Sequence, residues 1–286
     1  MSQLPVWLRG LLRRRPSTPG PLCVIGDVHG QLAKLVKLLR AARLVDGDLA
    51  WSGGQAALWF IGDFVDRGPD GIGVIELVMR LQEEARAADG QVGALLGNHD
   101  VLLLAAKRFG GLRVQGRNNG SFLEDWKESG GQESDLARLR GRHRDWIAAL
   151  PAMALVGQRL LAHADSTMYL DYGFSVKDVN KRIRAVLQGD EAKAWARLLD
   201  DFGRKREFVG EQPIAQVRDF LALYGGQQLV HGHSPIRTMS DLRPEETVSP
   251  WVYADGLCVN VDGGMGTTGP GFVAELPPLG ERVMRR

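Results

Sequence analysis

Five of the six histidines in this 286-residue chain follow short apolar runs, where buried strands are expected to end. These histidines are His29, His99, His163, His231 and His233. Carboxylate and amide side chains occupy matching positions, namely Asp27, Asp63 and Asn98. Because the carboxyl ends of neighbouring strands meet at one edge of an open α/β sheet, we expect these side chains to converge there.

The expected ligand set is larger than a single tetrahedral metal ion needs. It comprises Asp27, His29, Asp63, Asn98, His163 and His233. Two cations a few ångströms apart repel each other unless an anion lies between them, so we expect Asp63 to bridge them. Imidazole, carboxylate and amide ligands without thiolate suit Mn²⁺, Fe or Zn²⁺ and leave the identity of the metal open. Water held between two such cations ionises near neutral pH, so the pattern predicts a two-metal hydrolase.

Apolar runs and helix-like segments alternate from Leu22 onward, which is typical of an α/β fold. The strand-like runs span residues 22–25, 58–61, 92–96, 155–162 and 227–230. No composition change marks a linker after Pro21, so residues 22–286 are predicted to form one domain.

Charge, cysteine content and apolar segments bear on three other possibilities: a nucleic-acid binder, a secreted disulfide-rich protein and a membrane protein. Lys and Arg total 36 against 34 Asp and Glu, and a net charge of +2 argues against a nucleic-acid binder with a large basic face. Cys23 and Cys258 both lie in apolar runs, which predicts buried thiols in a reducing, cytoplasmic compartment. Residues 1–21 join a short apolar stretch to three arginines and are predicted to form a flexible tail. No later segment is apolar enough over its length to suggest a membrane span.

Residues 110–150 are more polar and are predicted to form a helical insertion or lid beside the site. His143 in this stretch is expected to be a solvated helix residue. Residues 264–269 match the G-x-G-x-x-G pattern of dinucleotide sites, but the following Gly-Pro-Gly would stop the helix that such a site requires. We therefore expect a glycine-rich connection between two strands.

The motifs resemble those of the calcineurin-like metallophosphoesterases. GDVHG, GDFVDRGP, GNHD, a later strand-end histidine and a terminal GH are similar to that family's five signature blocks, in the same order. GDFVDRGP is typical of the phosphoprotein phosphatase branch, which includes Shewanella-like phosphatases and symmetrical diadenosine tetraphosphate hydrolases. The resemblance covers about Leu22 to Leu276 and implies a four-layer α-β-β-α sandwich.

The resemblance also implies roles for single residues. Asp27 and His29 would hold the first metal, Asp63 would bridge, and the second metal would be held by Asn98, His163 and His233. Arg67 would bind the phosphate together with Asn98, because a planar guanidinium can donate two parallel hydrogen bonds to phosphate oxygens. His99 would contact the phosphate and protonate the leaving oxygen, and Asp66 would orient its ring.

Three positions depart from the family pattern or leave a choice open. His163-Ala164-Asp165 stands where the phosphatases usually show His-Gly-Gly, which predicts an extra carboxylate near the second metal. In HGHS, alignment on Gly-His makes His233 the ligand and His231 its neighbour. A second phosphate-binding arginine is expected at Arg206, with Arg204 and Arg237 as alternatives.

The resemblance implies a metal-dependent phosphatase that hydrolyses phosphomonoesters, with Ser/Thr phosphoproteins as the expected substrates, through in-line attack by a bridging hydroxide. The alternative is a symmetrical dinucleoside polyphosphate hydrolase, which an aromatic and basic pocket from residues 110–150 would favour. A phosphate-sensing scaffold without turnover is the third interpretation. The expected partner is a phosphorylated protein or a nucleotide, and the oligomeric state stays open.

Overall fold

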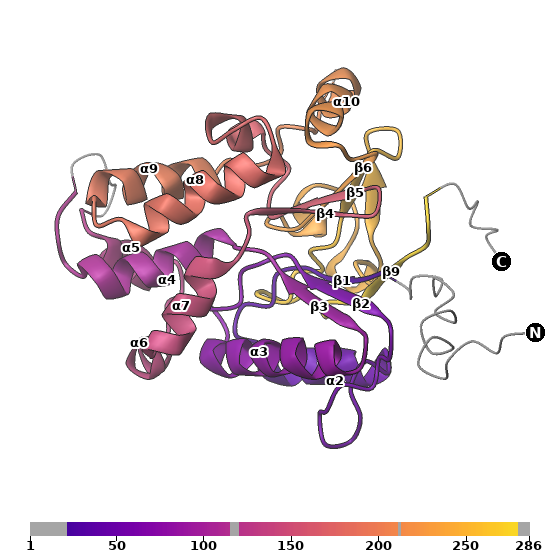
Figure 1. The fold of residues 1–286 in the computed structure, drawn as a ribbon, viewed down its shortest axis with the longest axis horizontal. Coiled ribbons are helices and arrows are strands. Elements are labelled where there is room, and N and C mark those ends of the chain that lie inside the picture. Colours follow the sequence, from indigo (N-terminus) through magenta and orange to yellow (C-terminus); the bar gives the residue numbers. More distant parts are fainter. Residues whose placement is uncertain (1–21, 115–119, 211–212, 280–286) are drawn as a thin grey trace, which may run out of the picture.

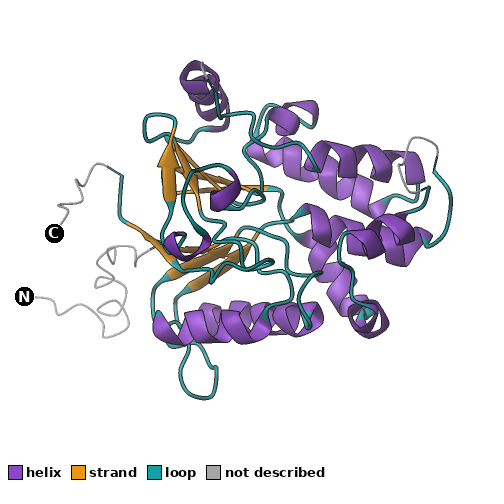
Figure 2. Ribbon diagram, turned by 180° about the vertical axis from the view of Figure 1, so that it is seen from behind, coloured by secondary structure: helices purple, strands orange, loops and turns teal. Residues whose placement is uncertain are grey.

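The computed structural model describes residues 22–114, 120–210 and 213–279. The expected tail at 1–21 lies outside the described residues. Two sheets stack face to face, with helices on their outer sides and a group of helices beside them (Figures 1 and 2).

The first sheet has the strand order β3-β2-β1-β9. Its strands are β1 (Leu22–Ile25), β2 (Ala57–Phe60), β3 (Gln91–Ala94) and β9 (Ala274–Leu276). β1, β2 and β3 run parallel, and β9 pairs antiparallel to β1. The carboxyl ends of the three parallel strands therefore meet at one edge.

The second sheet has the order β4-β5-β6-β8-β7. Its strands are β4 (Met153–Val156), β5 (Arg159–Ala162), β6 (Gln228–His231), β7 (Trp251–Tyr253) and β8 (Cys258–Asn260). β5, β6 and β8 are parallel to one another, whereas β4 and β7 are antiparallel edge strands.

Alternation along the strands divides the core between the two faces of each sheet. Val24 and Trp59 of the first sheet pack with Leu161 and Val230 of the second in one cluster between the sheets. Their strand neighbours, Cys23 and Leu58 among them, belong to a larger cluster shared with the helices. This division confirms the α-β-β-α sandwich.

The helices complete the outer layers and the helical group. They are α2 (Leu32–Ala41), α3 (Gly71–Ala87), α4 (Asn98–Phe109), α5 (Phe122–Glu128), α6 (Glu133–Arg138), α7 (Gly141–Ala149), α8 (Val176–Gln188), α9 (Ala192–Phe202) and α10 (Pro213–Tyr224). Short 3₁₀ turns occur at Thr167–Asp171, Ile236–Thr238 and Pro244–Glu246. α2 and α3 cover the first sheet, α10 lies over the second, and α4 to α9 form the group beside them (Figure 1).

The structure corrects the expectation of one strand at residues 155–162. This run is a hairpin, because Gly157 adopts φ +57° and turns the chain between β4 and β5. The glycine-rich stretch at 264–269 connects β8 to β9, as expected, and thereby joins the second sheet to the first.

The stretch 122–149 contains α5, α6 and α7, separated by short turns. Both cysteines are free and buried. In the part of the chain that the structure describes, no helix combines the length and apolarity needed to cross a bilayer.

Candidate active site

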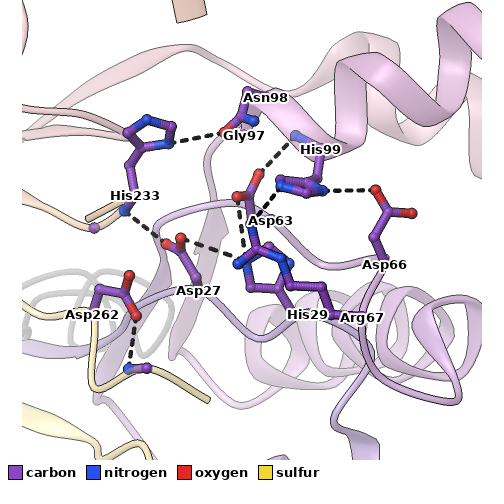
Figure 3. Close-up of polar contacts among 12 residues, drawn as sticks. Asp27, His29, Asp63, Asp66, Arg67, Gly97, Asn98, His99, His233 and Asp262 are labelled. Atoms are coloured by element: carbon purple, nitrogen blue, oxygen red, sulfur yellow. Dashed lines mark hydrogen bonds and ion pairs between the residues drawn. The ribbon is translucent and has the colours of Figure 1, made fainter. Parts of the chain in front are cut away.

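The six expected metal ligands meet where the two sheets present the carboxyl ends of their strands, and Figure 3 shows five of them. The sixth, His163, lies 3.0 Å from Asn98 Oδ1 through its Nε2. The loop after β1 carries Asp27 and His29, and the loop after β2 carries Asp63. Asn98 begins α4 directly after β3. His163 follows β5 and His233 follows β6, so the second sheet supplies the remaining two side chains.

A buried carboxylate joins two of these loops. Asp100 Oδ2 accepts the backbone N–H groups of Asp63 and Gly97, and its Oδ1 accepts that of Phe64, each at 2.9 Å. The backbone N–H of His99 in turn donates to Asp63 Oδ1 at 2.9 Å. The loop after β2 and the start of α4 are therefore held as one unit, a function of Asp100 that sequence reasoning missed although GNHD contains it.

One group of candidate metal donors consists of Asn98, His163 and His233, of which the two histidines lie with Asp63 in an arrangement that could hold a metal ion. His163 Nδ1 donates to the carbonyl oxygen of Ile61 at 2.8 Å, so the lone pair of its Nε2 points into the site. Asn98 Oδ1 lies 3.0 Å from this Nε2 and 2.9 Å from His233 Nδ1. Atoms that carry lone pairs are thus crowded together, an arrangement that a cation stabilises.

A second group consists of Asp27, His29 and Asp63. His29 Nδ1 donates to the carbonyl oxygen of Val65 at 3.0 Å, so its Nε2 lone pair also faces inward. This Nε2 lies 3.8 Å from Asp27 Oδ2 and 3.6 Å from Asp63 Oδ2. The other oxygen of Asp63 lies 3.6 Å from His163 Nε2. Asp63 therefore faces both groups, as a bridging carboxylate must.

Electrostatics favours a cation at this site. Burial and the nearby charges of Asp262 and Asp63 raise the pKa of Asp27 well above its usual range. Burial likewise raises the pKa of Asp262 to about 7, and this second missed carboxylate lies beside Asp27 (Figure 3). Buried like charges disfavour one another, and divalent cations remove that cost. The residues therefore fit a pair of divalent metal ions.

The glycine-rich stretch supports the first group of donors. A Cβ atom on Gly266 would lie 2.7 Å from Cγ of His29, which shows that the backbone packs against the imidazole ring. Lys34 Nζ holds this stretch by donating to the carbonyl oxygens of Met265 and Gly269. Because Gly266 has no side chain, the imidazole of His29 can pack directly against its backbone.

A histidine–carboxylate pair lies beside the metal donors. His99 Nδ1 is 2.7 Å from Asp66 Oδ2, and both side chains are buried. Arg67 Nη2 lies 2.9 Å from His99 Nε2, and Arg67 Nη1 lies 2.8 Å from His29 Nε2. Imidazole and guanidinium therefore meet at the edge of the metal donors, where they can contact one bound phosphate (Figure 3).

The extra carboxylate after His163 does not join the metal donors, contrary to expectation. Asp165 is fully buried and accepts the Arg206 backbone N–H at 2.9 Å and the Tyr253 hydroxyl at 2.9 Å. The same hydroxyl lies 2.8 Å from His231 Nε2. The ring of His231 is thus hydrogen-bonded to Tyr253, whereas His233 Nδ1 lies against Asn98 Oδ1.

The three candidate phosphate-binding arginines differ in their surroundings. Arg204 is paired with Glu207 and Asp171. Arg206 has an exposed side chain, and φ is +60° at this residue. Arg237 Nε is buried and has no hydrogen-bond partner among the described residues. An exposed guanidinium such as that of Arg206 is free to bind an anion, whereas that of Arg204 is committed to carboxylates.

The expectation for His143 was wrong. This side chain is buried, and its Nδ1 accepts the backbone N–H of Arg140 at 3.2 Å at the start of α7. Burial lowers its pKa below the ordinary histidine value. Sequence reasoning missed this because a histidine at the third position of a helix can cap the backbone instead of facing solvent.

Comparison with known proteins identifies the family. The model of the calcineurin-like phosphoesterase family matches residues 20–259. The chain belongs to this family of phosphoesterases. Shewanella-like protein phosphatase 2 of Arabidopsis thaliana is 27% identical over 141 residues, which are 49% of this chain and 36% of that protein. A symmetrical bis(5'-nucleosyl)-tetraphosphatase of Bordetella parapertussis is 31% identical over 145 residues, 51% of this chain and 43% of that protein.

This calcineurin-like phosphoesterase spans less than half the length of either of those curated relatives. Among solved structures, the cold-active protein-tyrosine phosphatase of a psychrophilic Shewanella species is similar to it, with a TM-score of 0.64 and 22% identity. The match covers 87% of this chain and 73% of that one. This similarity supports the fold.

Proposed function

We propose that this calcineurin-like phosphoesterase is a metal-dependent phosphatase that hydrolyses phosphomonoesters, with Ser/Thr phosphoproteins as substrates. The observation that carries the proposal is the position of the Arg67 guanidinium, which contacts His29 of the metal donors and His99 of the histidine–carboxylate pair. A phosphate held there would contact the metal donors on one side and a proton donor on the other.

Different residues of the chain would hold the metal ions, bind the phosphate and donate the proton. Divalent ions held by the two donor groups would supply the Lewis acidity that ionises water and offsets the charge of the phosphate. Arg67 and Asn98 would bind the phosphate oxygens, and Arg206 would add a second guanidinium. His99 would donate a proton from Nε2 to the departing oxygen, while Asp66 holds the other ring nitrogen.

Hydrolysis of symmetrical dinucleoside polyphosphates is the second candidate, because a tetraphosphatase is among the relatives. Such an enzyme must hold an adenosine beyond the cleaved bond, and an aromatic, basic pocket would serve this purpose. The structure has a hollow of about 750 Å³ lined by Arg108, Arg144, Arg184 and Trp195. None of its lining residues is a metal donor or belongs to the histidine–carboxylate pair. This separation supports the phosphomonoester as the better candidate.

A substrate panel with Mn²⁺, Fe²⁺ or Zn²⁺ added to metal-free protein tests the proposal. Phosphoserine, phosphothreonine and phosphotyrosine peptides are compared with diadenosine tetraphosphate by kcat/KM. We expect the phosphopeptides to be preferred, and a clear preference for the dinucleotide would establish the second candidate instead.

Asp63→Asn is the matched control, because it keeps the side-chain volume and removes the bridging charge. Wild-type protein no more active than this variant on any phosphate ester would favour the scaffold interpretation. The two free, buried thiols support the cytoplasmic location that we include in the proposal.

A further inference from the structure

The helical insertion contacts the segment of residues 66–72, which carries Asp66 and Arg67, at several points. Trp126 Nε1 of α5 donates to Asp66 Oδ1 at 2.8 Å. The Arg67 backbone N–H donates to the Gly130 carbonyl oxygen at 2.7 Å. In α6, Asp135 accepts the N–H groups of Gly71 and Ile72 at 3.0 and 3.1 Å, at the start of α3.

The held segment has an unfavourable backbone conformation. Asp66 and Arg67 have φ of +68° and +64°, in the left-handed region that residues with a Cβ rarely occupy. Such a conformation persists only where its surroundings hold it. The hydrogen bond from Arg67 to Gly130 is one of these restraints, so the insertion helps to maintain the backbone that presents both side chains.

The contact of Trp126 with Asp66 is more specific than packing. Among the residues that the structure describes, each oxygen of Asp66 has one hydrogen-bond partner, since Oδ2 lies against His99 Nδ1 and Oδ1 accepts the Trp126 N–H. Trp126 and Asp66 are both fully buried. Two donors on different oxygens fix the rotation of the carboxylate and therefore the direction in which it holds the imidazole.

We propose that Trp126 is a positioning residue, which holds Asp66 so that His99 can protonate the departing oxygen of the substrate. This inference rests on the proposed function. It assigns a task to the insertion, because α5 then forms part of the support of the general acid. Trp126 acts through Asp66, and its own contact is with that carboxylate.

The test compares two esters that differ in their need for an acid. p-Nitrophenolate leaves readily without a proton, whereas phenolate depends on protonation. Trp126→Phe removes the indole N–H and keeps an aromatic ring. We expect kcat to fall by about 10- to 100-fold on phenyl phosphate, part of the contribution of a general acid, and by less than about 3-fold on p-nitrophenyl phosphate.

Trp195→Phe is the matched control. Trp195 is also buried, and its Nε1 donates to the Gly189 carbonyl oxygen at 3.0 Å rather than to a residue of the histidine–carboxylate pair. A purely structural effect would lower the rates on both esters alike in both variants. Equal losses on the two esters in Trp126→Phe, or no loss, would overturn the proposal while leaving the proposed function intact. Wild-type protein that hydrolyses neither ester would overturn the proposed function itself.

A double-mutant cycle gives a second test. If Trp126 acts only through Asp66, adding Trp126→Phe to Asp66→Asn should lower kcat by less than about 2-fold further. Multiplicative losses would contradict the proposal.

A spectroscopic measurement covers the case in which Trp126→Phe does not fold. In protein labelled with ¹⁵N-tryptophan, the indole N–H resonance of Trp126 should shift in Asp66→Asn, because its acceptor loses its charge. The indole resonance of Trp195 should stay in place. An unchanged Trp126 resonance would show that the hydrogen bond does not form in solution and would overturn the proposal.

Discussion

Replacing Asp100 with asparagine should lower stability and metal affinity together. Asp100 accepts three buried backbone N–H groups, and an asparagine offers a single acceptor oxygen. If the amide oxygen of the asparagine replaces Oδ2, its NH₂ group replaces Oδ1. The backbone N–H of Phe64 would then face another donor and lose its hydrogen bond. A hydrogen bond to a charged group contributes about 1.5–3 kcal/mol, and an unsatisfied buried group costs a similar amount.

Part of this loss is offset because the variant carries no buried charge. Burial, together with the charge of Asp63, already raises the pKa of Asp100 well above its usual range. We therefore expect the free energy of unfolding to fall by about 2 kcal/mol. Because the same carboxylate holds the backbone of the bridging Asp63, metal affinity should fall by about 10- to 100-fold, as is usual when a residue supporting a ligand is removed.

Urea unfolding followed by circular dichroism measures the first quantity, and calorimetric titration of the metal-free protein with Mn²⁺ measures the second. Asp135→Asn is the matched control, because Asp135 is also buried and accepts the N–H groups of Gly71 and Ile72. It should lose stability and keep its metal affinity. An Asp100→Asn variant that behaves in the same way would refute the link to the metal centre. Unchanged unfolding would refute the argument about buried donors.

Three further predictions follow from the site and from α7. His99→Ala should lower kcat by about 10²- to 10⁴-fold and leave the metal content unchanged by elemental analysis, since loss of metal would make His99 a ligand rather than an acid. Gly266→Ala should weaken metal binding, because the added Cβ would lie 2.7 Å from Cγ of His29 and displace the imidazole ring. The same calorimetric titration measures this, and unchanged metal affinity would contradict the packing argument. Burial lowers the pKa of His143, so below about pH 6.5 the unfolded chain binds a proton that the folded chain does not. The free energy of unfolding of the protein should therefore fall as the pH is lowered from about 7.5 to about 5.5. His143→Gln should make this pH dependence weaker, as measured by urea unfolding at each pH.

The local order of the chain determines much of the candidate metal site. Short apolar runs followed by Asp, His or Asn predict strands with ligands at their carboxyl ends, because each side chain is placed by its distance from the end of its own strand. Asp27, His29, Asp63 and Asn98 lie together for this reason, and their strands are parallel neighbours. The hairpin at Gly157 was not predicted, since an apolar run with one glycine reads equally well as a single strand.

Tertiary structure decided what surrounds these ligands. Asp165 follows His163 in the chain, yet its partners are Tyr253 and the backbone of Arg206, which no local pattern reveals. Trp126 reaches Asp66 across 60 positions of sequence. A ligand at a strand end depends on the periodicity of that strand, which is a local property. The partner of a buried polar group depends on which distant donor packing brings within hydrogen-bonding distance, and only the folded chain determines that.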